Sequence, residues 1–250
     1  GESRGLPLGE IADRLGLNVS TVHHLLATLR HRGLIVQDER SRAYRIGYRL
    51  VGLVNRFLAE SDLYPAAIGA IQRLRDASGE TSYLSAFQDG AIAEVISLTG
   101  VRPIQVRRVH RPGQSSLHST ATGKLLLAHL PPAEAAARLA APSLSPFTPN
   151  TRTDPGGLGT ELSLIRARGY SLDDEEDYLG VMCVAAPVFA AGGDCVASVS
   201  VSYPASPPAR TGELIDLVAT AAAAVSANLG AVPARPAAFG ADGHAAGGRG

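Results

Sequence analysis

The chain has 250 residues, of which 45% are hydrophobic and 18% are charged, and its formal net charge of zero and mixed composition are typical of a globular protein with room for two domains. Its two cysteines, Cys183 and Cys195, are too few for a disulfide scaffold or a cysteine-rich metal site. No signal peptide is visible and no apolar run approaches the roughly 18 residues of a membrane span, so we expect a cytoplasmic protein without a membrane partner.

Charge is distributed unevenly along the chain. Residues 1–50 carry eight arginines and five acidic residues, a formal charge of +3, and the remaining residues carry −3. A small basic module on a larger acidic body is typical of a nucleic-acid-binding domain joined to a second domain with another task.

Residues 8–35 have the apolar spacing of two short helices joined by a turn. The first helix is expected to end at Gly16, and Asn18 is expected to cap the second helix. Four residues of the second helix recur at i, i+3, i+4 and i+7, which predicts one buried stripe: Val22, Leu25, Leu26 and Leu29. The outward face then offers candidate DNA contacts from short hydroxyls and imidazoles: Ser20, Thr21, His23 and His24. Taken alone, an ordinary amphipathic surface helix has the same pattern.

A basic hairpin is predicted directly after the second helix. The apolar run 34–36 is followed by a polar tip and a second β-prone segment that ends at Gly47. A hairpin in this position is a wing, and its arginines are candidates for phosphate or minor-groove contacts: Arg40, Arg42 and Arg45. Helix, turn, helix and basic hairpin in this order predict a winged helix-turn-helix DNA-binding domain over residues 1–47.

The segment before Leu8 is too short for the additional N-terminal helix that a complete winged domain normally needs, and the chain does not begin with Met. We therefore expect the natural sequence to start further upstream, and we expect the chain as given to bind DNA less well than the extended one. If the winged domain cannot fold, the alternative function is a small-molecule sensor or interaction module that does not bind DNA.

A linker helix is predicted over residues 48–62, with one broad apolar face. This face either packs within the chain or pairs with its copy in a dimer, which would present two DNA-binding domains to two half-sites. The apolar residues are Leu50, Val51, Leu53, Val54, Phe57 and Leu58.

Helices and strands follow one another in residues 63–232, which predicts an α+β domain. The helix of residues 155–168 has the clearest limits, because Asp154 is available as its N-cap and Gly169 closes it. The tail 233–250 has almost nothing to bury and is expected to be disordered. Further helices are expected at 65–77, before Pro131, at 133–140 and at 213–229, and strands at 81–88, 91–98, 104–109, 181–189 and 195–203.

Several polar segments of this domain are candidates for a ligand site. A small, hydroxyl-rich helix entry at 116–122 is a common seat for an anion, although a plain helix cap is the alternative. Cys183, Ser200 and Ser202 have the spacing to face one side of a sheet. The acidic run 173–177 is interpreted as a solvated turn rather than a metal site.

Long ordered segments of this sequence resemble the IclR family of bacterial transcription regulators. The match runs from Leu8 to about Gly230 and rests on LGEIADRLGLNVSTVHHLLATL, HSTATGKLLLAHLP, the TPNT that begins at Thr148, ELSLIRARGYSLDDEEDYLGVMCVAAPV and the paired serines of SVSVS. The resemblance implies a winged helix-turn-helix, a linker helix and a GAF/profilin-like effector-binding domain, in homodimers or homotetramers. The family usually carries Arg where this chain has His24, so we expect a weaker grip on DNA at that position.

The resemblance also implies an effector pocket. The matched positions are Ala121, Thr122, Asp173, Val181, Cys183, Ser200 and Ser202. Ala121 and Thr122 begin a helix, where free N–H groups and the helix dipole suit a carboxylate. His118 is expected to orient the loop before that helix rather than to act as a base or a metal ligand.

The sequence offers little support for an enzyme. His118, Ser119 and Cys183 are residue types found in nucleophilic catalysis, but the sequence has no nucleophile elbow, P-loop, HExxH or dinucleotide fingerprint. We expect no catalytic residue, no cofactor and no metal. The sequence predicts a regulator whose binding to double-stranded operator DNA is controlled by a small, carboxylate-bearing metabolite.

Overall fold

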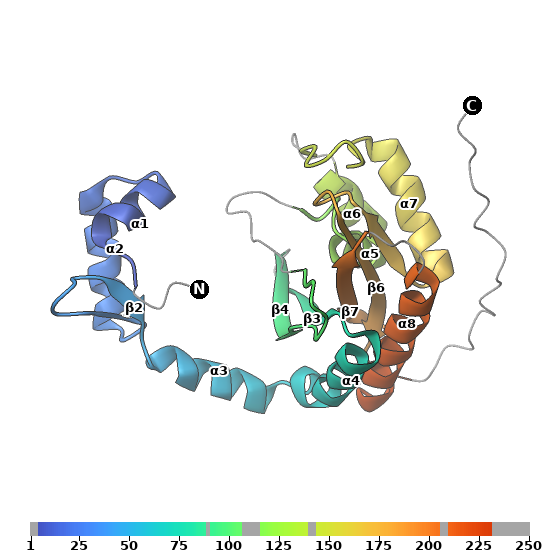
Figure 1. The fold of residues 1–250 in the computed structure, drawn as a ribbon, viewed down its shortest axis with the longest axis horizontal. Coiled ribbons are helices and arrows are strands. Elements are labelled where there is room, and N and C mark those ends of the chain that lie inside the picture. Colours follow the sequence, from blue (N-terminus) through green and yellow to red (C-terminus); the bar gives the residue numbers. More distant parts are fainter. Residues whose placement is uncertain (1–4, 89–90, 107–115, 140–143, 206–209, 232–250) are drawn as a thin grey trace. The chain divides into compact units, whose positions relative to one another are not determined.

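The computed structural model describes residues 5–88, 91–106, 116–139, 144–205 and 210–231 (Figure 1). The chain divides into two compact units, Gly1–Asp62 and Leu63–Gly250, and each unit is described by itself. The predicted disordered tail 233–250 and the Asp89–Gly90 turn lie outside the described residues.

The first unit consists of two short helices, a two-stranded hairpin and a third helix. Gly16 ends the first helix with a φ of 63°, and the side chain of Asn18 accepts a hydrogen bond from the Thr21 N–H (2.8 Å) and so caps the second. Both predicted helix limits are therefore confirmed. The elements are α1 (Leu8–Leu15), α2 (Val19–His31), β1 (Ile35–Gln37), β2 (Tyr44–Ile46) and α3 (Arg49–Glu60).

The core of this unit is smaller than the sequence predicts. Val22 and Leu26 of α2 are buried against residues of α1 and the hairpin, but Leu25 and Leu29 are 50% and 38% exposed. The prediction of a four-residue buried stripe is wrong for these two leucines, because they lie on a side of α2 that none of the described elements covers. Val51 and Leu53 of α3 are also half exposed or more.

The second unit is built on an antiparallel sheet of five strands in the order β4-β3-β7-β6-β5. Both predicted hairpins, β3 with β4 and β6 with β7, are confirmed, whereas the short edge strand β5 was not predicted. The strands are β3 (Thr81–Gln88), β4 (Ala91–Leu98), β5 (Ser171–Asp174), β6 (Val181–Phe189) and β7 (Cys195–Pro204).

The strand predicted at 104–109 is wrong for residues 104–106, and residues 107–109 lie outside the described residues. After Gly100 the backbone turns back toward the residues just before β3. There the N–H groups of Val101 and Arg102 both donate hydrogen bonds to the carbonyl of Gly79. Ile104 is 70% exposed, so its apolar side chain does not pack on the sheet as a strand residue would.

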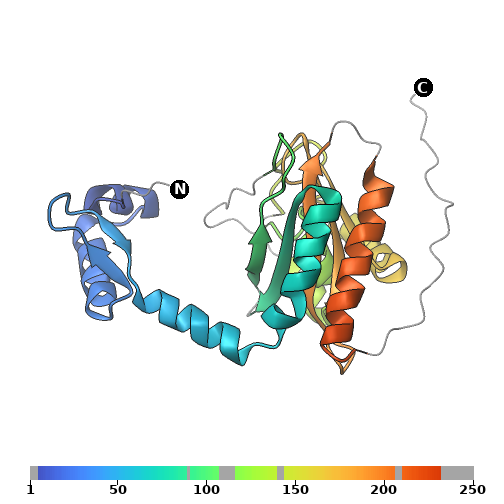
Figure 2. The same cartoon turned by 60° about the horizontal axis from the view of Figure 1, so that its bottom comes forward.

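Helices cover both faces of this sheet. Figure 2 shows α4 and α8 side by side over one face, where they pack on Val184, Val199 and Val201. Helices α5 and α7 cover the other face, where Cys183 and Ala185 join their apolar cluster. The predicted caps of α7, Asp154 and Gly169, are confirmed. The helices are α4 (Leu63–Ser78), α5 (Ala121–His129), α6 (Pro132–Leu139), α7 (Pro155–Arg168) and α8 (Thr211–Asn228).

Candidate functional site

The four candidate DNA contacts on α2, namely Ser20, Thr21, His23 and His24, all have exposed side chains. The cap fixes the first turn, because Asn18 Oδ1 accepts both the Ser20 hydroxyl (2.9 Å) and the Thr21 N–H (2.8 Å). The start of α2 therefore presents hydroxyls and imidazole rings on a backbone that is held in place.

The hairpin also exposes its three candidate arginines, Arg40, Arg42 and Arg45. Asp38 organises the tip, because its carboxylate accepts hydrogen bonds from the Ser41 N–H (2.8 Å) and from Arg45 Nη2 (2.9 Å). Hydrogen bonds from the N–H group and the hydroxyl of Ser41, together with the positive charge of Arg45, hold the pKa of Asp38 below its usual value. The Arg45 guanidinium is thus shared with Asp38, whereas Arg42 shapes the turn with a left-handed φ of 57°.

A cavity of about 360 Å³ lies in the second unit against the ends of β5, β6 and β7. Four of the seven predicted effector residues line it: Asp173, Val181, Cys183 and Ser202. The other three, Ala121, Thr122 and Ser200, are fully buried, and the hydroxyl of Thr122 contacts that of Ser200 (3.4 Å). Sequence reasoning missed further lining residues: Ile104, Gln105, Val106, Thr120, Asp177, Tyr178, Leu179, Gly180 and Pro204.

The sheet places the polar lining residues in one row. Asp173, Cys183 and Ser202 occupy paired positions on β5, β6 and β7, and the Cys183 thiol lies 3.0 Å from the Ser202 hydroxyl. Ser200, two residues before Ser202, faces the same side and meets Thr122 of α5. The cavity therefore presents small hydrogen-bonding groups beside the carboxyl groups of Asp173 and Asp177.

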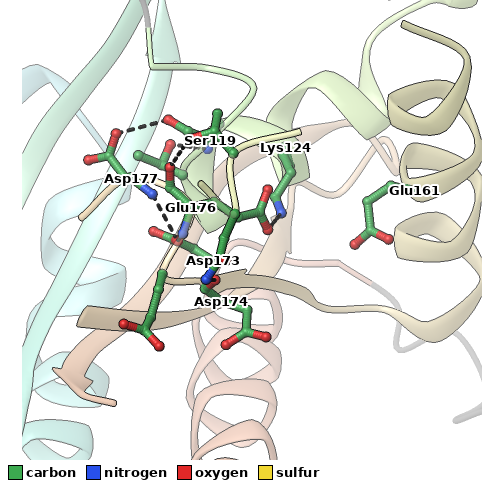
Figure 3. Close-up of polar contacts among 12 residues, drawn as sticks. Ser119, Lys124, Glu161, Asp173, Asp174, Glu176 and Asp177 are labelled. Carbon is green, nitrogen blue, oxygen red and sulfur yellow. Dashed lines mark hydrogen bonds and ion pairs between the residues drawn. The ribbon is translucent and has the colours of Figure 1, made fainter. Parts of the chain in front are cut away.

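The acidic run 173–177 is not the solvated turn that the sequence predicts. The residues Asp173, Glu176 and Asp177 are only 1%, 5% and 9% exposed. Burial is possible because α5 and the residues just before it supply partners for these carboxylates. Lys124 of α5, itself 1% exposed, pairs with Glu176. The hydroxyl of Ser119 donates to Asp177 (2.9 Å), as Figure 3 shows. A lysine inside an otherwise apolar helix was the signal for this pairing.

The loop that contains Thr148 and Thr151 holds the same acidic segment from the other side. The Thr148 hydroxyl donates to the carbonyl of Glu175 (2.7 Å), and the Thr151 hydroxyl donates to that of Glu176 (2.6 Å). His118 is buried, with Nε2 3.0 Å from the Ser145 carbonyl, as expected of a residue that orients a loop. The TPNT motif thus fixes the backbone of the cavity wall.

Asp173 is the titratable group whose environment matters most to the cavity. Burial raises its pKa to about 7, although backbone hydrogen bonds and the nearby Lys124 oppose this rise. A carboxyl group with this pKa is neutral in a large fraction of molecules near pH 7.

The part of the chain that the structure describes contains no group of three His, Cys, Asp or Glu side chains arranged to hold a metal ion. Within the same residues, no helix combines the length and the apolar character that crossing a membrane requires.

A helix-turn-helix with a hairpin wing, followed by a separate α+β unit with a ligand-sized cavity, defines a ligand-responsive DNA-binding regulator. The chain belongs to the IclR family of transcriptional regulators. The IclR helix-turn-helix domain matches residues 1–39, and the domain described as "Bacterial transcriptional regulator IclR C-terminal" matches residues 55–227.

Individual relatives agree with this assignment. The chain is 38% identical over 228 residues to the HTH-type transcriptional regulator BhcR of Paracoccus denitrificans, an alignment that covers 90% of this chain and 81% of the relative. The crystal structure of the Thermotoga maritima IclR matches with a TM-score of 0.68 at 31% identity, over 92% of this chain and 93% of that chain. An IclR homologue from Microbacterium hydrocarbonoxydans, solved in complex with 4-hydroxybenzoate, shares the fold with a TM-score of 0.74 at 21% identity, over 92% and 93% of the two chains.

Proposed function

We propose that the first unit binds operator DNA and that a small carboxylate-bearing metabolite in the cavity of the second unit controls this binding. The observation that carries the proposal is a cavity of about 360 Å³ on the same chain as a helix-turn-helix, in which hydroxyl, thiol and carboxyl groups lie among apolar side chains. The proposed DNA contacts are Ser20, Thr21, His23, His24, Arg40, Arg42 and Arg45, and the proposed effector residues are Ala121, Thr122, Asp173, Val181, Cys183, Ser200 and Ser202.

The start of α5 supports a carboxylate as the ligand. The Thr120 side chain caps the helix by accepting the Gly123 N–H (3.1 Å), and Thr120 itself lines the cavity. Backbone N–H groups in the first turn of a helix and the helix dipole favour a negative charge nearby. A cavity of about 360 Å³ lies at the lower end of the range of roughly 300–1,000 Å³ that is usual for small-molecule sites.

The mechanism that we propose is a shift between two arrangements of the regulator. The effector binds one arrangement more tightly, and the linker helix over residues 48–62 transmits this preference from the effector domain (63–232) to the DNA-binding domain (1–47). A cytoplasmic homodimer or homotetramer would present the two DNA-binding domains that two half-sites require. In this proposal the chain acts by binding and not by catalysis.

A salt series of DNA binding tests the first half of the proposal, with this chain and an upstream-extended version on the intergenic DNA beside its own gene. Specific binding with an affinity that falls steeply as salt rises is expected. Absence of specific binding by both versions, with and without candidate carboxylates, would favour a sensor that does not bind DNA.

A cavity-filling variant tests the second half. Cys183→Met places a longer side chain in the cavity and is expected to abolish the effect of carboxylates such as 4-hydroxybenzoate on DNA binding, while DNA binding itself is kept. Cys195→Met is the matched control, because Cys195 lies at the start of β7 and does not line the cavity. An equal response to the effector in both variants would remove Cys183 from the site.

A further inference from the structure

One side chain of the first unit, that of Gln37, connects α2 to the tip of the hairpin. Gln37 is the last residue of β1 and is half-buried. Its Oε1 accepts a hydrogen bond from Nη1 of Arg30, which lies in the last turn of α2 (2.9 Å). Its Nε2 donates a hydrogen bond to the carbonyl of Arg42 in the tip (3.0 Å). The two ends of a single amide group thus contact the helix that we propose to read DNA and the wing beside it.

The chemistry of the two partners fixes the orientation of the Gln37 amide. A guanidinium group can only donate a hydrogen bond and a carbonyl oxygen can only accept one, so the amide oxygen must face Arg30 and the amide nitrogen must face Arg42. An ionised Glu at position 37 would satisfy Arg30 alone, and Met would satisfy neither partner. This connection therefore needs both halves of an amide.

The backbone of Arg42 is the part of the tip that this connection holds. Arg42 has a φ of 57°, in the left-handed region that residues with a Cβ rarely adopt. Its N–H group donates to the carbonyl of Asp38 (2.9 Å), and its own carbonyl accepts the hydrogen bond from Gln37. Such a conformation persists where the surrounding structure holds it from more than one side. Gln37 therefore stabilises the backbone conformation that sets the direction of the Arg42 side chain.

The arginines of the wing differ in what their guanidinium groups contact. The Arg45 guanidinium pairs with the carboxylate of Asp38 (2.9 Å). The Arg42 side chain is exposed, and within the described residues its guanidinium group makes no hydrogen bond or ion pair. A guanidinium group without a protein partner, on a backbone that is already fixed, loses little conformational freedom when it binds a phosphate. Arg42 is therefore better placed than Arg45 to bind the DNA backbone.

We infer that Gln37 is a positioning residue for DNA binding, which fixes the wing to α2 and holds Arg42 in position to bind a DNA phosphate. This inference rests on the proposed function and deepens it, because it gives a role in DNA binding to a residue that does not itself contact DNA. The physical basis is preorganisation: the spacing between α2 and the wing arginine is set before the DNA arrives, so fewer torsions are ordered on binding.

The salt dependence of DNA binding by the full chain tests the inference, with Gln37→Met as the variant. The probe is a DNA duplex of mixed sequence, because a phosphate contact does not depend on the sequence. Gln37→Met keeps the length of the side chain and the net charge but removes both hydrogen bonds. We expect the slope of log affinity against log salt to fall by about 0.5, which near 0.1 M salt corresponds to about threefold weaker binding. A change confined to the packing of the hairpin would leave the slope as it is.

A double-mutant cycle shows whether Gln37 acts through Arg42. Arg42→Ala alone is expected to lower the slope by about 0.9, which near 0.1 M salt is about eightfold in affinity. The double variant of Gln37→Met with Arg42→Ala is expected to bind as Arg42→Ala does, because the positioned group is then absent. Gln72→Met is the matched control, since it makes the same chemical change at an exposed residue of α4 in the second unit. Additive losses, or an unchanged slope in Gln37→Met, would overturn this inference and leave the proposed function standing.

A measurement without DNA completes the test. The N–H group of Arg42 donates within the tip, so its hydrogen exchange, followed by NMR, reports how often the tip opens. We expect Gln37→Met to speed this exchange by at least about threefold. The N–H group of Val22, which donates to Asn18 inside α2, should keep its rate and so show that the unit stays folded.

The two measurements together distinguish the possible failures. Unchanged exchange at Arg42 in Gln37→Met refutes the inference whatever the DNA result. If the exchange becomes faster but the parent chain binds no duplex DNA at any salt concentration, DNA binding by the first unit is refuted, and with it both the proposed function and this inference.

Discussion

The buried pair of Lys124 and Glu176 allows a quantitative prediction for Lys124→Met. The two side chains are 1% and 6% exposed, so this substitution would leave the Glu176 carboxylate buried without a counter-charge. Removal of one partner from a buried ion pair costs about 3–5 kcal/mol, and in a unit of this size such a loss lowers Tm by about 6–20 °C. The variant is therefore expected to lose a large part of the free energy of unfolding of the second unit.

Two comparisons isolate the electrostatic cause. The double variant Lys124→Met and Glu176→Leu removes both charges and is expected to recover most of the loss, because an apolar pair of similar volume often replaces a buried ion pair at little cost. Arg138→Met breaks the more exposed ion pair between Arg138 and Glu134 and should cost less than about 1 kcal/mol.

Urea unfolding of the full chain, followed by far-UV circular dichroism, measures these differences. The unfolding transition of the second unit is identified with the variant Asn18→Ala. This substitution removes a helix cap in the first unit, so it should shift only the transition of the first unit. If Lys124→Met unfolds within about 1 kcal/mol of the parent chain, or if the double variant is no more stable than the single one, the ion pair does not stabilise the cavity wall.

Three further predictions concern other parts of the chain. Asn18→Ala removes the cap of α2 and should destabilise the first unit by about 1 kcal/mol in thermal unfolding; an unchanged transition would contradict the capping role. His24→Arg should tighten operator binding and steepen its salt dependence by about one phosphate contact, and an unchanged slope would remove position 24 from the interface. Gly123→Ala would place a Cβ 2.4 Å from the Leu117 carbonyl oxygen and should cost about 1–3 kcal/mol, whereas Gly159→Ala, which meets nothing within 4 Å, should be neutral or stabilising in the same urea assay.

Local signals in the sequence were sufficient for most elements of the fold. Asp154 and Gly169 define the ends of α7, and the alternating apolar residues define β6 and β7, because caps and strand periods depend on near neighbours in sequence. The four-residue strand β5 is different. It contains two aspartates and is too short to show a period, so its pairing with β6 could not be predicted.

Errors arose where burial depends on distant segments. Leu25 and Leu29 have the spacing of buried residues, but the spacing does not tell which side of a helix the rest of the fold covers. The acidic run resembles a solvated turn until Lys124, 52 positions earlier in the sequence than Glu176, pairs with it. A lysine inside an apolar helix indicates that a charged partner exists, but a local pattern does not show where in the sequence that partner lies.

The candidate site was predicted in part for the same reason. Asp173, Val181, Cys183 and Ser202 came from the resemblance to a family, and all four line the cavity. Ile104 was missed because its segment was taken for a strand, although it borders the cavity as irregular chain. A cavity is made by the convergence of several segments, and only the three-dimensional structure shows which of them meet.

Lys124 is the only lysine among the 250 residues, and its amino group is buried. Amine-directed acylating reagents therefore find no accessible lysine side chain within these 250 residues when they are folded. Acylation of Lys124 itself would occur only in molecules whose cavity wall has opened, so the extent of that reaction, read by mass spectrometry, reports how often the second unit opens.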